Sequence, residues 1–202
     1  MDAFMTGVAA GYGIAIPVGA IAILIMDVGI RRGFGPALSA GAGAATADLL
    51  YAALAVVGGA TLASTVKSIG DPLRIASGMV LLVIAMLGLF RSRRPAEANV
   101  TEPRSADLAR TYGRFVGLTI INPTTVVYFA AVVIGLGVAS GMTAADGVLF
   151  VIGAFLASLS WQTLIAAVGT FAGHRLSVRS RRVVTIVGNL VILAFGIVIL
   201  LG

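Results

Sequence analysis

The chain has 202 residues, of which 59% are hydrophobic and 11% are charged, and its mean hydropathy is +1.07. Soluble domains carry about 25% charged residues, so this composition excludes an ordinary soluble protein and indicates one membrane domain. There is no cysteine and only one histidine, His174, which excludes disulfides, thiolate catalysis, cysteine-ligated metals and any site that needs two histidines.

Six apolar runs approach or exceed the length of about 20 residues that a helix needs to cross a bilayer. The N-terminal one has no basic region before it, so we expect no cleaved signal peptide. We therefore predict an all-α membrane protein with six transmembrane helices. The runs are Phe4–Val28, Pro36–Ala60, Leu73–Phe90, Phe115–Ala139, Gly147–Phe171 and Val183–Leu201.

The connection from Arg91 to Arg114 is the one long polar stretch, with six arginines, three acids and two prolines. It predicts a mobile loop that holds about one helical turn. We expect a single domain over 1–202, with a first repeat at about 1–91, a cytoplasmic loop at about 92–113 and a second repeat at about 114–202.

The basic residues predict the orientation, because cytoplasmic loops are enriched in lysine and arginine. If both termini lie outside, twelve of the 14 basic residues are cytoplasmic, and only Lys67 and Arg74 are not. The net charge of +6 thus reflects topology, and we expect no nucleic-acid partner.

The two halves of the chain resemble each other. Gly43–Asp48 in the second run parallels Gly153–Ser158 in the fifth, and the residues from Gly78 parallel those from Gly188. Because each half has three spans, the second half enters the membrane from the side opposite to the first. This predicts an inverted 3+3 repeat with a site near the middle of the membrane. Chance similarity between apolar helices is the alternative.

Prolines interrupt the first and fourth runs at Pro17 and Pro123. Proline removes a backbone donor, and the freed carbonyl needs a partner in protein or in a water-filled cavity. Gly19 would let a ligand approach the backbone, and Asn122 and Thr125 add polar groups at the same depth. We predict a binding site at these breaks, although plain kinks would explain the prolines as well.

Asp48 is the acid at the centre of the second run. An acid there costs about 2.5 to 3.5 kcal/mol on insertion scales, so it should point into the bundle. Its helix face is otherwise small, which lets another helix approach closely. We predict that Asp48 couples transport to protons or meets a substrate amine. The alternative is a structural acid that is hydrogen-bonded to a neighbouring helix, for example through Thr46 or Tyr51 nearby.

The fifth run carries Ser158, Ser160, Trp161 and Gln162 in mid-span. Because tryptophan usually lies at the membrane interface, Trp161 is expected either to wall a cavity or to be packing bulk. We assign Ser158 and Trp161 to the site.

Two further features have structural readings. Asp27 and Arg31 are spaced for an interfacial ion pair, which is preferred over a site. The small-residue pairs Gly7/Gly11 and Gly169/Gly173 permit close helix packing and are compatible with a homodimer without specifying one.

Together these motifs resemble the LysE/RhtB amino-acid exporters over nearly the whole chain. They are Ile16–Gly19, Ala47–Tyr51, the Gly78 pattern ending in Arg91, Asn122–Pro123, Gly153–Ser158 with Trp161, and Gly188 with Phe195–Gly196. The resemblance implies six spans and proton-driven export of amino acids or related metabolites from a bacterial inner membrane. Two positions differ from many members: a second proline is absent at Gly19, and Thr124 replaces a lysine.

We therefore predict a secondary transporter for a small amino acid or similar zwitterion, working by proton antiport. The transport site would comprise Asp48, Tyr51, Pro17, Gly19, Asn122, Pro123, Thr125, Ser158 and Trp161. No enzyme activity, cofactor or metal site is expected. The alternatives are a divalent-cation exporter of the same superfamily and a non-transporting membrane scaffold.

Overall fold

The computed structural model describes residues 2–16, 19–92, 105–122, 125 and 142–201, and all regular structure within them is helical. The expected all-α class is confirmed for this part of the chain. Three helical segments are long and apolar enough to cross a membrane, or four if the bent pair α1 and α2 forms one span. The helices are α1 (Ala3–Ala15), α2 (Ala20–Arg32), α3 (Phe34–Ser92), α4 (Ser105–Ile120), α6 (Ala144–Arg175) and α7 (Val178–Leu201).

The first apolar run forms two helices instead of one. α1 ends at Ala15, α2 begins after Gly19, and the two helices are bent by 77° relative to each other. Pro17 lies outside the described residues. α2 ends at Arg32 and is followed by Gly33, whose φ of +85° suits a residue without a side chain and allows α3 to begin at the next position.

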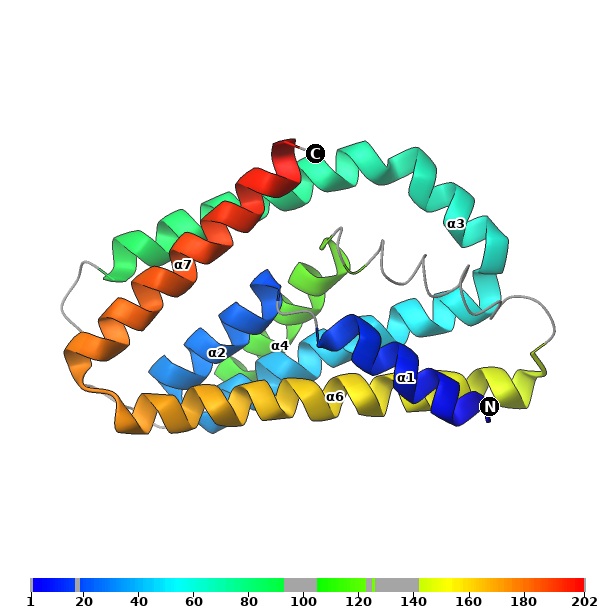
Figure 1. The fold of residues 1–202 in the computed structure, drawn as a ribbon, viewed down its shortest axis with the longest axis horizontal. Coiled ribbons are helices and arrows are strands. Elements are labelled where there is room, and N and C mark those ends of the chain that lie inside the picture. The colour runs from blue at the N-terminus through cyan, green and yellow to red at the C-terminus, as the bar shows by residue number, and fades with distance from the viewer. Residues whose placement is uncertain (1, 17–18, 93–104, 123–124, 126–141, 202) are drawn as a thin grey trace.

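The second and third runs belong to one 59-residue helix, α3, which curves around one side of the molecule (Figure 1). We expected separate spans. The helix continues through Pro72, because proline can bend a helix without ending it. Its first part, Phe34–Gly58, is long enough to span a membrane, whereas the apolar part Gly78–Phe90 is shorter.

The polar connection is helical from Ser105 onward, where we had expected a loop with about one turn as far as Arg114. The reason is an amphipathic pattern: Thr111 and Phe115 are buried one turn apart, and the residues between them are exposed. α4 then ends at Ile120, just before Asn122.

Close packing against α6 organises the bundle, with α1 and α2 lying along it (Figure 1). Gly7 and Gly11 lie directly against the α6 backbone, and a methyl group added at Gly169 would lie 2.6 Å from the carbonyl oxygen of Met26 in α2. Gly173 packs on α2 in the same way. Both glycine pairs therefore serve packing within one chain and give no evidence for a homodimer.

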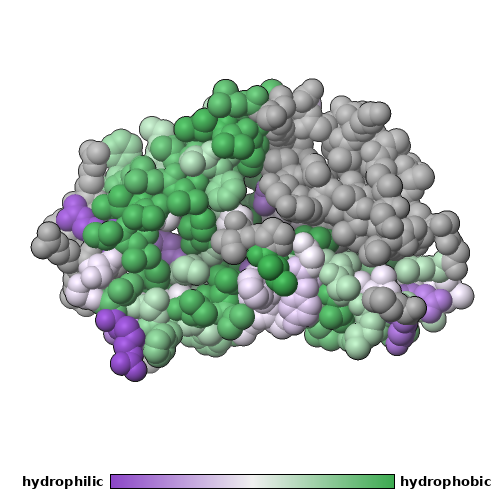
Figure 2. Space-filling view, in the orientation of Figure 1, coloured by the Kyte–Doolittle hydropathy of each residue, from purple (hydrophilic) through white to green (hydrophobic). Residues whose placement is uncertain are grey.

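The outer surface is strongly apolar. Figure 2 shows hydrophobic side chains gathered over α7, and hydrophilic ones mainly toward the two ends of the long axis. Exposed residues of α7 include Val187, Leu190, Ile197 and Val198. Such a continuous apolar surface is what lipid contact requires.

Candidate functional site

A cavity of about 150 Å³ lies where α1, α2, α3, α4, α6 and α7 come together. Its wall contains the backbone of two helix ends, one carboxyl side chain, two hydroxyl side chains and two amide side chains. Residues of α3 and α7 add an apolar part. Its lining consists of Ile14, Ala15, Gly19, Ala20, Ile21, Ala22, Asp48, Leu81, Thr119, Asn122, Thr125, Gln162, Phe195 and Ile199.

Asp48 is the carboxyl group of this cavity. It is only 5% exposed, in agreement with the expected inward orientation, and its face of α3 consists of fully buried alanines such as Ala44 and Ala52. The hydroxyl group of Ser158 in α6, itself fully buried, donates a hydrogen bond of 2.6 Å to Asp48 Oδ2. Small residues let α3 and α6 approach closely enough for this contact.

The structural alternative for Asp48, an acid hydrogen-bonded to a neighbouring helix, is compatible with this bond from α6. The partners that it suggested, Thr46 and Tyr51, donate hydrogen bonds elsewhere. The Thr46 hydroxyl donates to the carbonyl of Ala42 and accepts a bond from Tyr112. The Tyr51 hydroxyl donates to the carbonyl of Ile120, at the end of α4. Tyr51 thus supports the edge of the site and is not among the residues that line it.

Two helix ends of opposite polarity open on the cavity. α1 contributes Ile14 and Ala15 from its C-terminal end, and α2 contributes its first turn, Ala20–Ala22, preceded by Gly19. Among the described residues, no side chain caps the start of α2, where the N-cap position is Gly19. Free N–H groups and a partial positive charge lie at a helix N-terminus, and free carbonyls and a partial negative charge lie at a C-terminus.

The break after α4 supplies a further wall. Asn122 follows the last turn of α4 and lines the cavity together with Thr125, which is 7% exposed. Thr119, one turn before Asn122, also lines it. Pro123, the residue expected to cause this break, lies outside the described residues.

Two polar lining residues were absent from the expected site, Thr119 and Gln162. Thr119 Oγ1 and Gln162 Oε1 are buried and have no hydrogen-bond partner among the described residues, although both belong to the cavity wall. Buried polar atoms are normally satisfied, so these are candidates for ligand or water contact. Gln162 lies four residues after Ser158 and Thr119 three before Asn122, about one helical turn in each case.

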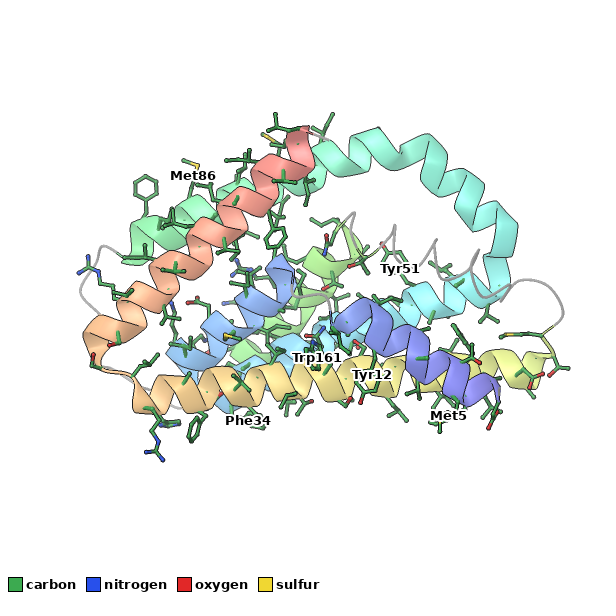
Figure 3. All side chains as sticks on the ribbon, viewed as in Figure 1. Met5, Tyr12, Phe34, Tyr51, Met86 and Trp161 are labelled. Atoms are coloured by element: carbon green, nitrogen blue, oxygen red, sulfur yellow. The ribbon has the colours of Figure 1, made fainter. Side chains whose placement is uncertain are left out.

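Trp161 packs on the core cluster around Ile25, Ala40 and Ile165 and does not line the cavity. This arrangement favours the packing interpretation of Trp161 over the cavity wall. Figure 3 shows Trp161 and Tyr51 on α6 and α3, near the end of α1, whereas Met5 and Met86 lie on outer faces.

The expected ion pair between Asp27 and Arg31 is confirmed. Arg31 Nε lies 3.0 Å from Asp27 Oδ1, away from the central cavity. The hydroxyl group of Thr185 in α7 donates to the same carboxylate oxygen at 2.8 Å. The pair therefore joins α2 to α7.

Comparison with known proteins identifies the relatives of this chain. Residues 13–202 match the family model described as LysE type translocator. A similar protein is the uncharacterized membrane protein YahN of Escherichia coli (strain K12), 27% identical over 114 residues, or 56% of this chain. The chain spans about half the length of that relative, 51%. No solved structure matches the chain. Since the family model covers nearly the whole sequence, this membrane protein belongs to the LysE type translocator family.

Proposed function

We propose that this protein exports small amino acids or similar zwitterions from the bacterial cytoplasm across the inner membrane, in exchange for protons. The observation that carries the proposal is the central cavity. It joins a buried carboxyl group, Asp48, to two helix ends of opposite polarity. Family membership supports transport, and the cavity supports the choice of cargo and coupling ion.

The size of the cavity favours a small cargo. Its volume is about 150 Å³. A cavity of about 150 Å³ in another protein takes up benzene, which has six heavy atoms. The smallest amino acids are of similar size, whereas a long basic or aromatic side chain would need further space.

The polarity of the cavity favours a zwitterion. The uncapped first turn of α2, Ala20–Ala22, suits a carboxylate, as at other helix N-termini. The C-terminal end of α1 and the carboxylate of Asp48 suit an ammonium group. Transporters with interrupted helices use the same division, with N-terminal ends toward anionic groups. Gly19, Asn122, Thr125 and, at the breaks themselves, Pro17 and Pro123 would shape this site.

Asp48 is the proposed proton carrier. Ionisable groups inside a membrane often act in proton relays, and among the described residues Asp48 is the acid on the cavity wall. Burial penalises its charged form unless a cation or proton neutralises it. Substrate ammonium and proton would therefore compete for one carboxylate, which is the simplest basis for exchange. Ser158 would orient that carboxylate.

We further propose six spans in an inverted 3+3 repeat, with both termini outside. Support comes from equivalent contacts in the two halves. Gly43 and Gly153 are 110 residues apart. A methyl group added at Gly43 would lie 2.5 Å from the Tyr112 carbonyl oxygen in α4. A methyl group added at Gly153 would lie similarly close to the Phe4 carbonyl oxygen in α1. Each half thus packs its second-span glycine on the first helix of the other half.

The test is counterflow in proteoliposomes loaded with a panel of amino acids and divalent cations, under an imposed pH gradient. We expect small neutral amino acids to move with the gradient. In Asp48→Asn, which keeps the size of the side chain, coupling to the gradient should be lost. Asp107→Asn is the matched control, because Asp107 lies in the first turn of α4 and outside the cavity.

The outcomes separate the alternatives. Amino-acid flux that follows the gradient equally well in wild type and Asp48→Asn would remove Asp48 from the coupling step. Flux of divalent cations alone would favour a cation exporter. No flux of any solute, from protein that elutes as a folded species, would favour a scaffold.

A further inference from the structure

A second, larger cavity lies at the opposite end of α2. Its volume is about 600 Å³, and it is lined by residues of α2, the C-terminal part of α3, α4 and α7. Three arginines line it, Arg31 and Arg32 from α2 and Arg114 from α4. All three belong to the stretches that the sequence predicts to be cytoplasmic.

The charges on this wall do not balance. Asp27 is the carboxylate that lines the cavity, and it forms an ion pair with Arg31, with 3.0 Å between Asp27 Oδ1 and Arg31 Nε. Arg32 Nη1 donates to the hydroxyl of Thr111, a neutral group, at 3.1 Å. Within the described residues, Arg32 and Arg114 have no carboxylate partner. Two positive charges thus face the cavity uncompensated by the part of the protein that the structure describes.

The cavity also adjoins the central one. A small space of about 10 Å³ lies between them. It shares Leu118 with the arginine-lined cavity, and it shares Ile21, Leu81 and Asn122 with the central cavity. Apart from Asn122 its wall is apolar.

We propose that the arginine-lined cavity is a second binding site, which takes the anionic group, a carboxylate or phosphate, of a soluble molecule. Guanidinium groups match the geometry of such groups and pair with them bidentately. The site is separate from the central cavity, and it does not depend on which cargo that cavity carries. Soluble anions and the phosphates of anionic lipids share this chemistry, so the test has to distinguish them.

The chain has no cysteine, so a single introduced thiol can report on the site without background. Val28→Cys places a thiol on the α2 wall of the cavity, and Ile84→Cys does so on the α3 wall if the first variant folds poorly. In phosphatidylcholine nanodiscs, we would compare the modification rates by methanethiosulfonate ethylsulfonate, an anion, and methanethiosulfonate ethyltrimethylammonium, a cation.

We expect the anionic reagent to modify the thiol faster than the cationic one. The ratio of the two rates should fall about 3- to 30-fold in Arg114→Gln, which is the effect of removing a unit charge roughly 8 Å away at a partly hydrated site. Inorganic phosphate should slow the anionic reagent in Val28→Cys, and less so once Arg32→Gln and Arg114→Gln are added. Arg175→Gln is the control. It removes a charge from the end of α6, where the guanidinium lies over the Phe171 ring and outside the cavity.

An equal loss of preference in Arg175→Gln would overturn the proposal, because the effect would then come from the general surface charge. Protection by phosphatidylglycerol in the nanodisc, with none by phosphate, would overturn it in favour of a lipid site. The measurement needs no flux, so failure of the export proposal would leave its result unchanged.

Discussion

Replacing Ser158 with alanine isolates the contact that holds the central carboxyl group in place. Ser158 Oγ lies 2.6 Å from Asp48 Oδ2, and the residues are 0% and 5% exposed. Alanine is smaller than serine and enters the site without a clash. The variant therefore removes one short, fully buried hydrogen bond between α6 and α3 and little else.

The magnitude follows from the burial and the medium. Hydrogen bonds between membrane helices average about 0.6 kcal/mol in double-mutant cycles, with a maximum of about 1.7 kcal/mol. A short bond excluded from water belongs in the upper half of that range. We therefore expect a coupling of about 1 to 1.5 kcal/mol between Ser158→Ala and Asp48→Ala.

The assay is reversible unfolding in mixed micelles for wild type, both single variants and the double variant. Thr163→Ala with Asp48→Ala is the control cycle, because the Thr163 hydroxyl donates to the Leu159 carbonyl within its own helix. That cycle should give a coupling near zero. If the two cycles gave the same coupling energy, the contact between Ser158 and Asp48 would not be the stabilising interaction that the structure implies.

Two further changes test the packing and the edge of the site. Gly169→Ala would place a methyl group 2.6 Å from the Met26 carbonyl oxygen and should destabilise by about 1 to 3 kcal/mol. In Gly113→Ala, where the added methyl group meets nothing within 4 Å, stability should stay equal or rise by up to about 1 kcal/mol. Equal thermal stability of the two variants would contradict this packing. Tyr51→Phe removes the hydroxyl that donates to Ile120 and should destabilise by about 1 kcal/mol in the same assay, while an unchanged midpoint would make that bond dispensable.

The sequence predicted the helix interruptions better than the helix lengths. The ends of α1 and α4 fall just before the two proline-bearing stretches, because proline and its neighbours restrict the backbone locally. The continuity of α3 through Pro72 was not predicted, because a proline can either bend a helix or end it. Hydropathy does not distinguish a bent helix from an interrupted one, since it reports how apolar a segment is and not the course of its backbone.

The sequence predicted those residues of the candidate site whose inclusion depends only on their position along an apolar run. From their positions in the apolar runs we expected Asp48, Gly19, Asn122 and Thr125 at a similar depth, and the structure gathers them around one cavity. The rotation of α6 could not be read in the same way. At about 100° per residue, Gln162 lies about 40° to one side of Ser158, and Trp161 about 60° to the other. Which side faces the cavity is decided by the packing of α6 on α1 and α2, where glycines on all three helices allow contact.

The proposed inverted repeat places Asp48 and Ser158 at equivalent positions of the two halves. The two residues are 110 residues apart, the same separation as Gly43 and Gly153, so they would occupy equivalent positions in the two halves. Equivalent residues can meet only close to the axis that relates the halves. Two carboxyl groups at 2.6 Å could not both be ionised. Under the proposed proton antiport, a hydroxyl on one side and an acid on the other would let a symmetric scaffold carry one exchangeable proton at its centre, with Ser158 as the donor that orients the acid.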